Sequence, residues 1–104
     1  MRTTYADPAH WTTVTLMDLT DQIEGWLITG VQVQARFRGR GYASDLLDRV
    51  CEDADAEGVR LFLEISPDGT GLSDAALDAF YRRHGFEEWE DGDEGSRVRE
   101  PRTD

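Results

Sequence analysis

The sequence predicts a single mixed α+β domain with the approximate element order ββαβαββ. Three observations support this class. β-Branched and aromatic residues dominate the first third of the chain, apolar residues then recur at helical spacing behind a glycine-rich turn, and a strand, a second helix and a hairpin follow. A chain of 104 residues, 38% of them apolar, has the size of one small domain, so we expect one domain over residues 1–104.

The first two strands are expected to form a β-hairpin. Residues 11–17 (WTTVTLM) and 23–34 (IEGWLITGVQVQ) have strand composition, and the turn-like DLTDQ lies between them. An isolated glycine inside a strand often marks a β-bulge, and Gly30 occupies such a position in the second strand.

The segment after the glycine-rich turn is predicted to be an amphipathic helix that ends near Glu57, before Gly58. Its apolar residues are Ala43, Leu46, Leu47, Val50, Cys51 and Ala54. Residues 59–66 (VRLFLEIS) then alternate as a strand, which places Glu64 on the face opposite Leu61 and Leu63.

The last third of the chain is predicted to form a helix and a second hairpin. PDGTG at 67–71 has loop composition, and Ser73 or Asp74 can cap a helix that runs through Arg83. Gly85 ends this helix at a position that favours a left-handed residue. FEEWE and SRVRE, which flank DGDEG, then form the hairpin.

Composition narrows the possible functions. The chain has 22 acidic and 11 basic residues and a net charge of −11. This charge disfavours nucleic acid and favours cationic partners. Selection for solubility, or a salt-adapted or high-GC source, would also explain the acidity. Cys51 is the only cysteine, and no His or Cys spacing indicates a metal site. Without a long apolar run or a signal-like start, we expect a cytoplasmic protein with no membrane partner.

The segment RFRGRGYA, residues 36–43, is the strongest candidate for a binding site. It joins a strand to a helix, and a helix start has unpaired N–H groups and a positive partial charge that suit a pyrophosphate. Gly39 and Gly41 leave room for the anion, and the arginines supply positive charge; a tight turn alone would also explain the glycines. The dinucleotide motif G-x-G-x-x-G fails at Ser44, and no P-loop lysine is present.

Two ordered motifs resemble those of the GNAT family of N-acetyltransferases. VQVQARFRGRGYASDLL is similar to its acetyl-CoA signature, matched as Arg38-x-x-Gly41-x-Ala43. DAALDAFYRRHGF at 74–86 is similar to its downstream Asn-x-x-Ala-x-x-Leu-Tyr-x-x-x-Gly-Phe motif. The resemblance covers roughly residues 23–100 and implies an acyl-CoA N-acyltransferase-like fold with a mostly antiparallel sheet and splayed central strands.

The resemblance also implies a cosubstrate site for acetyl-CoA. The backbone of Val31 and Val33 would pair with the pantetheine arm, and Asp74, where the family often has Asn, would contact pantetheine amides only as an acceptor. The residues implied to hold the pyrophosphate through backbone N–H groups are Arg38, Gly39, Arg40, Gly41, Tyr42 and Ala43.

Two residues are implied to act in catalysis. Tyr81 would protonate the departing CoA thiolate, and Glu64 or a water would accept the proton of the amine. Each has a structural alternative: Tyr81 as a core residue beside Phe80 and Phe86, and Glu64 as a solvated sheet residue. His84, in the last helical turn, is favoured as a complement to the helix dipole rather than as a base.

These expectations describe an enzyme that transfers acetyl from acetyl-CoA directly to a primary amine of a small molecule or peptide, without a metal. A non-catalytic acyl-CoA-binding domain and an acidic interaction protein that mimics nucleic acid remain alternatives. The usual N-terminal helices of the family are missing ahead of the CoA motif. We therefore expect a homodimer that covers apolar sheet positions left partly exposed, namely Trp11, Val14, Trp26 and Ile28.

Overall fold

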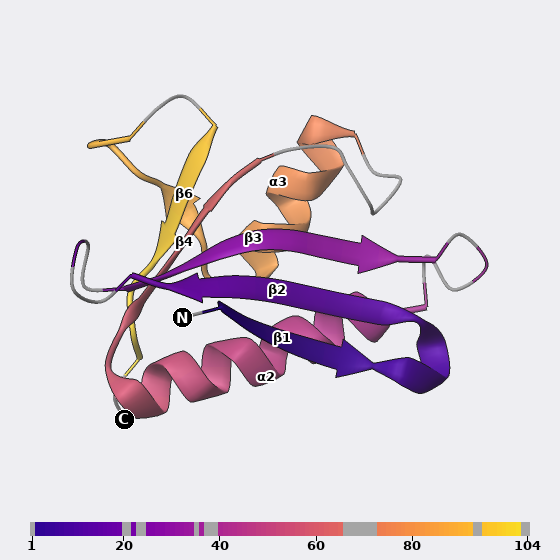
Figure 1. Ribbon diagram of the computed structural model, residues 1–104. Coiled ribbons are helices and arrows are strands. Elements are labelled where there is room, and N and C mark those ends of the chain that lie inside the picture. Colours follow the sequence, from indigo (N-terminus) through magenta and orange to yellow (C-terminus); the bar gives the residue numbers. More distant parts are fainter. Residues whose placement is uncertain are drawn as a thin grey trace.

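The computed structural model describes residues 2–19, 22, 25–34, 36, 40–65, 73–92 and 95–102. Figure 1 shows the elements in chain order. They are β1 (Arg2–Asp7), the 3-10 turn η1 (Pro8–His10), β2 (Thr12–Asp18), β3 (Gly25–Val33), α2 (Tyr42–Glu57), β4 (Arg60–Glu64), α3 (Asp74–Arg83), β5 (Glu87–Glu88) and β6 (Ser96–Arg99).

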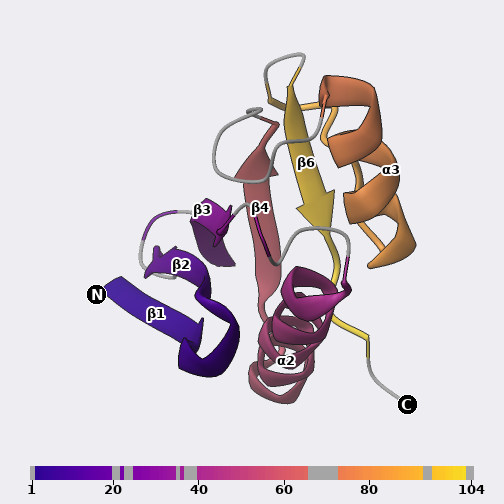
Figure 2. The same cartoon turned by 90° about the vertical axis from the view of Figure 1, so that its right-hand side faces the viewer.

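The strands form one six-stranded sheet in the order β1-β2-β3-β4-β6-β5. Only β3 and β4 pair in parallel, and the other neighbouring strands are antiparallel. Both helices lie on the same face of the sheet, which leaves the other face open (Figure 2). The predicted mixed, mostly antiparallel α+β class is confirmed.

The first strand is an addition to the predicted order. β1 pairs with β2 from Arg2 opposite Met17 to Asp7 opposite Thr12. The turn between them ends at Trp11, which has a left-handed φ of 47°. A six-residue segment followed by proline carries a weak local signal, so its strand conformation depends on pairing with β2.

The hairpin of β2 and β3 and its bulge agree with the prediction. Thr15 pairs with Gly30 but Leu16 pairs with Ile28, so Thr29 is an extra residue in β3. The Thr29 hydroxyl donates a hydrogen bond to the Thr15 carbonyl at 3.2 Å. Because of the bulge, Ile28 and Val31 both lie on the helix-covered face although three positions separate them.

The core lies between the sheet and the two helices. Its members include Leu46, Leu47 and Val50 of α2 and Leu61, Leu63, Leu77 and Phe86 elsewhere. The prediction that Val14 and Ile28 are partly exposed is wrong. Val14 is 0% exposed and Ile28 is 6% exposed, because both side chains point at α2 rather than away from it. Trp11 is 62% exposed, and Trp26 is half-buried.

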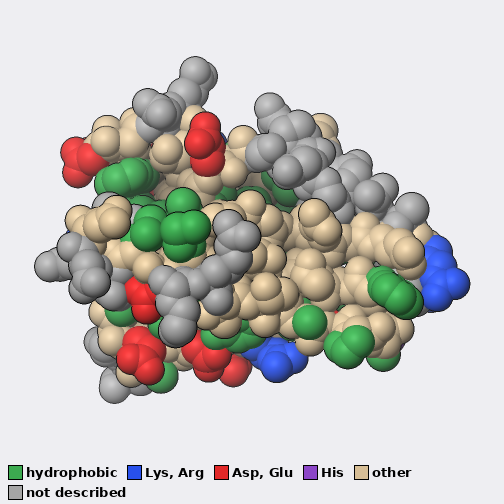
Figure 3. Space-filling view, in the orientation of Figure 1, with side chains coloured by type: hydrophobic (Ala, Val, Ile, Leu, Met, Phe, Trp, Pro, Cys, Tyr) green, Lys and Arg blue, Asp and Glu red, His purple; other side chains and the backbone are tan. Residues whose placement is uncertain are grey.

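The open face is formed mainly by uncharged side chains. Strand alternation places Thr13, Thr15 and Met17 of β2 on it, each half-buried. The charged side chains visible on this face lie at its rim, whereas its centre is uncharged (Figure 3). Phe62 also points to this side but is buried, because Trp89 packs on it at 4.9 Å between ring centroids.

The helix ends follow the predicted capping residues. α2 begins after Gly41, with φ 83°, and ends at Gly58, with φ 69°. Ser73 caps α3 by accepting a hydrogen bond from the Ala76 N–H at 3.2 Å, and Gly85 follows the helix with φ 93°. Among the described residues, neither helix combines the length and apolar character that a membrane span requires.

The strand β6 is fastened to both helices by buried arginines. The Arg99 guanidinium donates to both carboxylate oxygens of Asp55 in α2, at 2.7 and 3.1 Å, and to the backbone carbonyl of His84 at 2.8 Å. The Arg97 guanidinium pairs with Asp78 of α3 at 2.9 Å. These contacts fix the end of α3 against the side of α2.

Candidate active site

The central strands β3 and β4 separate halfway along the sheet. Their parallel pairing covers Gly25–Ile28 of β3 and ends with the pair Ile28–Leu63. Beyond the bulge, β3 continues to Val33 along β2, whereas the Ile65 N–H turns to the carbonyl of Gly95 on the β6 side, at 2.8 Å. In the described part of the chain, no strand pairs with the other edge of β3 from Thr29 to Val33.

Val31 and Val33 lie on this diverging part of β3. Both side chains are buried, and Val31 belongs to the core cluster that also contains Tyr81. Their side chains therefore anchor the strand, while the backbone of this part of β3 lies beyond the last residue pair with β4. An unpaired strand edge offers N–H and C=O groups to an extended ligand.

The start of α2 is open to an anion. The first intrahelical bond runs from the Asp45 N–H to the Gly41 carbonyl at 2.9 Å, so the N–H groups of Tyr42, Ala43 and Ser44 precede the helical ladder. Gly41 has no side chain to cap them, and a Cβ at Gly41 would have no atom within 4 Å. Among the described residues, the space beside Gly41 is therefore open.

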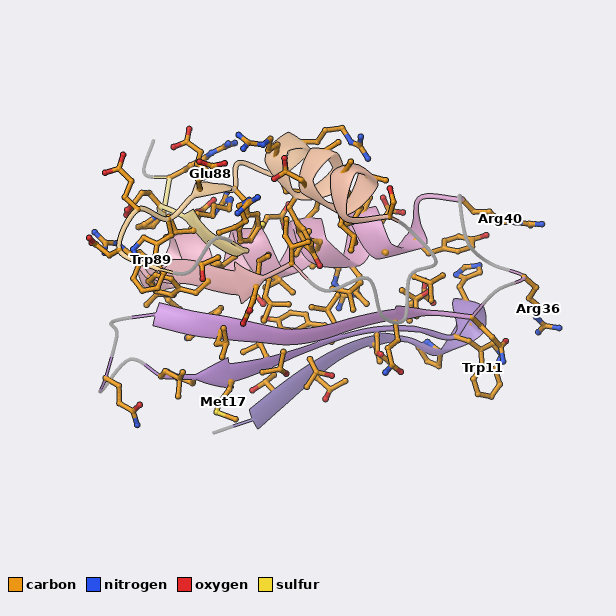
Figure 4. All side chains as sticks on the ribbon, turned by 90° about the horizontal axis from the view of Figure 1, so that it is seen from above. Trp11, Met17, Arg36, Arg40, Glu88 and Trp89 are labelled. Atoms are coloured by element: carbon orange, nitrogen blue, oxygen red, sulfur yellow. The ribbon has the colours of Figure 1, made fainter. Side chains whose placement is uncertain are left out.

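Positive charge gathers at the same end of the molecule. Figure 4 shows Arg36 and Arg40 at the end where α2 begins, on the same side as Trp11. Both arginines are exposed. Arg38 and Gly39 lie outside the described residues, so the described part of the predicted pyrophosphate segment consists of Arg40, Gly41, Tyr42 and Ala43.

The first turn of α2 makes two contacts that the sequence does not predict. The Tyr42 ring stacks on the His10 ring, with 3.6 Å between ring centroids. The Ser44 hydroxyl lies 3.0 Å from Nε2 of His84, and Nδ1 of the same ring lies 2.8 Å from the carboxylate of Asp48. Ser44 and Asp48 are four residues apart on one helical face, but the sequence carries no signal that His84 meets that face.

His84 differs from its predicted role. Its side chain is 7% exposed, and burial lowers the pKa of the imidazole below its ordinary value, against the opposing effect of Asp48. A neutral ring adds no charge to the end of α3. Its polar contacts, with Ser44 and Asp48, are with α2, so the interpretation as a dipole complement is incomplete.

Tyr81 lies in the core. It is 7% exposed, and its ring makes edge contacts with Phe80 and Phe86 at 5.2 and 5.6 Å between centroids. These contacts hold the ring in one orientation. A packed ring and a reactive hydroxyl are compatible, so its role as proton donor stays a prediction.

Glu64 and Asp74 lie on either side of residues 66–72, which are outside the described part of the chain. Glu64 is the last residue of β4, is exposed, and shares the open face with Phe62. Asp74 is the first residue of α3, and its side chain lies outside the described part. Glu64 is therefore accessible to a substrate, and its role as base stays a prediction.

Cys51 is a packing residue in α2. It is buried on the apolar stripe, and burial raises the pKa of its thiol to about 11, which leaves it protonated at neutral pH. The described residues contain no group of three or more His, Cys, Asp or Glu side chains placed to hold a metal ion.

Splayed central strands beside an open helix start are the features that the resemblance implies for an acyl-CoA N-acyltransferase fold. The family model of the acetyltransferase (GNAT) domain matches residues 9–88, and the chain belongs to the GNAT acetyltransferase family. No curated protein matches the sequence.

Two solved structures share the fold. The crystal structure of anti-CRISPR protein AcrVA5 is 21% identical with a TM-score of 0.72, over 94% of this chain and 95% of that chain. The crystal structure of a GNAT-family acetyltransferase from Staphylococcus aureus Mu50 is 18% identical with a TM-score of 0.66, over 88% of this chain and 60% of that one. At these identities the likeness concerns the fold alone.

Proposed function

We propose that the protein transfers acetyl from acetyl-CoA to a primary amine, in one step within a ternary complex. The observation that carries this proposal is the separation of β3 from β4 beyond Ile28, together with a start of α2 at a glycine that has no capping side chain, in a chain of the GNAT family. One site binds an extended amide chain and the other an anion, and CoA contains both in one molecule.

The binding roles follow from this arrangement. The backbone of Val31 and Val33 pairs with the pantetheine amides, and the segment from Arg38 to Ala43 holds the pyrophosphate. Arg36 and Arg40 add positive charge at the phosphate end of a strongly acidic protein. Asp74, near the pantetheine, accepts a hydrogen bond from an amide N–H.

The chemistry needs one proton acceptor and one proton donor. The neutral amine attacks the thioester carbonyl, a C–N bond forms, and the C–S bond breaks. Glu64, directly or through water, takes the proton of the amine, and the Tyr81 hydroxyl gives a proton to the departing thiolate. Holding two substrates in line is worth roughly 7–11 kcal/mol in favourable systems, so no covalent enzyme intermediate is required.

A binding domain without catalysis is the second candidate. The burial of Tyr81 between two phenylalanines favours it, because packing alone would explain an aromatic residue at this position. Such a domain would bind acetyl-CoA without releasing thiol in the presence of amines. An acidic interaction protein, the third alternative, would not bind acetyl-CoA.

The biological setting is part of the proposal. We infer a small-molecule or peptide amine as acceptor, since net charge −11 attracts cations and repels nucleic acid. We also infer a cytoplasmic location, no membrane partner, no metal, and a homodimer. Acetyl-CoA is then the only cosubstrate.

The test is calorimetry with acetyl-CoA on the wild type, Gly41→Val and Gly58→Val. Both glycines have positive φ and open space at Cβ, but they lie at opposite ends of α2. The two variants therefore carry similar backbone strain, and only Gly41→Val narrows the anion space. We expect at least about tenfold weaker binding for Gly41→Val relative to Gly58→Val.

Activity is measured as thiol release with a panel of amines and peptides. Thiol release that depends on an amine supports the enzyme, and binding without release indicates the non-catalytic domain. Equal affinity of the two glycine variants would reject the start of α2 as the phosphate site.

A further inference from the structure

We propose that Ser44 donates a hydrogen bond to a CoA phosphate and that His84, held by Asp48, must be protonated for it to do so. His84 and Asp48 are positioning residues that act through the Ser44 hydroxyl. This inference rests on the proposed binding of acetyl-CoA at the start of α2. It makes CoA affinity depend on pH through one buried histidine.

The geometry joins the three side chains in one line. Asp48 lies 2.8 Å from Nδ1 of His84, and Nε2 on the other side of the ring lies 3.0 Å from Ser44 Oγ. Ser44 is in the first turn of α2, and side chains on a helix tilt toward its N-terminus. The hydroxyl therefore lies beside the N–H groups that face the anion.

The proton on His84 decides what Ser44 offers. Asp48 as a carboxylate accepts only, so Nδ1 carries a hydrogen. In the neutral ring Nε2 is then an acceptor and takes the hydrogen of the Ser44 hydroxyl, which leaves only lone pairs for an incoming phosphate. In the protonated ring Nε2–H donates to Ser44 Oγ, and the hydroxyl hydrogen is free to bind a phosphate oxygen.

The groups around His84 have opposing effects on its protonation equilibrium. Asp48 in α2 favours the imidazolium, whereas burial and the nearby cations Arg83 of α3 and Arg99 of β6 disfavour it. The Phe80 ring packs against the imidazole, with 5.2 Å between the ring centroids. The net effect lowers the pKa of His84, so the free protein holds a neutral ring at neutral pH.

A bound phosphate reverses that balance. The added negative charge and the Ser44 hydrogen bond both favour the imidazolium, so the pKa of His84 rises on binding. By linkage, binding takes up a proton, and affinity increases as pH falls from the pKa of His84 in the complex toward its lower pKa in the free protein. Above that range the serine contributes little.

The experiment is titration calorimetry of acetyl-CoA from about pH 5.5 to pH 8, in buffers of different ionisation enthalpy, which counts the protons taken up. The ligand's own phosphates titrate equally in every variant. We expect Ser44→Ala to bind about tenfold more weakly than the wild type near pH 6 and within about twofold near pH 8. Ser44→Thr keeps the hydroxyl and the pH dependence.

Two further variants separate the effect of the Asp48–His84–Ser44 contacts from a general effect of charge. Asp48→Asn is expected to move the pH dependence to lower pH, because the ring loses its carboxylate. Glu52→Gln removes the same charge one turn further along α2 and is expected to leave the pH dependence in place. The wild-type protein supplies an independent readout, since the NMR titration of the His84 ring should shift to higher pH when CoA is added.

The outcomes distinguish this inference from the proposed function. If the wild type binds no acetyl-CoA at any pH, the proposed function is wrong and this inference is wrong with it. If the wild type binds acetyl-CoA with the same pH dependence as Ser44→Ala, or the His84 titration is unmoved by CoA, only this inference is wrong. A purely structural Ser44–His84 contact would give that second result.

Discussion

Tyr81 illustrates how one residue can serve the core and the chemistry through different atoms. Its ring packs between Phe80 and Phe86, and the proposed reaction uses only its hydroxyl. Tyr81→Phe keeps the ring, so the fold and the affinity for CoA should be preserved. We expect turnover to fall by about 100-fold, the lower range for loss of a general acid, as measured by thiol release under saturating substrates.

Tyr5→Phe is the matched control for this prediction. The Tyr5 hydroxyl bonds to Asp53, on the part of the sheet where β1 pairs with β2. Loss of that hydroxyl should leave turnover unchanged. If Tyr81→Phe keeps full activity while the chemical step limits turnover, water supplies the proton to the thiolate and Tyr81 serves only the core.

At the scale of elements, the contact of β6 with α2 should control acid stability. The hydrogen bond from Arg99 is the largest cause that lowers the pKa of Asp55 below its ordinary value of 3.8. A carboxyl with a lowered folded-state pKa stabilises the fold above its unfolded-state pKa, and this stabilisation is lost as pH falls through the folded-state pKa. The pair should therefore act fully at neutral pH and fade below about pH 4.

Arg99→Met tests this contact. Arg99 is 4% exposed, and breaking a buried pair leaves the Asp55 charge without its partner, so we expect a loss of about 3 kcal/mol in urea unfolding at pH 7. The difference from the wild type should shrink in acid. Arg60→Met, which removes an exposed pair with Glu100, should cost less than about 1 kcal/mol. Equal losses for the two variants would contradict the prediction.

An element could be predicted from the sequence when the residues that stabilise it are close together in the chain. The end of α2 at Gly58 and the cap of α3 at Ser73 or Asp74 were predicted because capping depends on a few adjacent residues. The bulge at Thr29 was predicted through Gly30 next to it. β1 was missed because its strand conformation comes from pairing with β2.

The candidate site was predictable only in part, for the same reason. The motif around Gly41 is contiguous, so the start of α2 and the run to Val33 were located from the sequence. The pair of Ser44 and His84 joins positions 40 residues apart and arises only when α3 packs beside α2. The separation of β3 from β4 was implied by the resemblance, because nothing local in either strand encodes it.

At the scale of the whole molecule, charge and an open sheet face act against each other. A second copy on that face would cover Met17 and its neighbours, but each copy carries a net charge of −11. Salt screens such repulsion over a Debye length of about 8 Å at 0.15 M. We therefore predict a homodimer whose association strengthens as the salt concentration rises, measured by light scattering across a dilution series.

Met17→Glu should weaken this dimer, whereas Gln22→Glu, the same charge change at an exposed position between β2 and β3, should not. The corrected burial of Val14 and Ile28 leaves a smaller apolar surface than expected, which favours a weak dimer. A mass that stays at 11.8 kDa at all concentrations and salt levels would rule it out.

We predict that the short parallel pairing of β3 with β4 divides the sheet into two cooperative units. Four residue pairs, from Gly25–Arg60 to Ile28–Leu63, join β1, β2 and β3 to β4, β6 and β5 across the sheet. Hydrogen exchange should therefore show two groups of amides with different opening free energies, one for each half. A ligand that inserts beyond this pairing touches both halves, so bound CoA should slow exchange in both groups and bring their opening free energies together. The substrate would then complete a sheet that the chain itself leaves half joined.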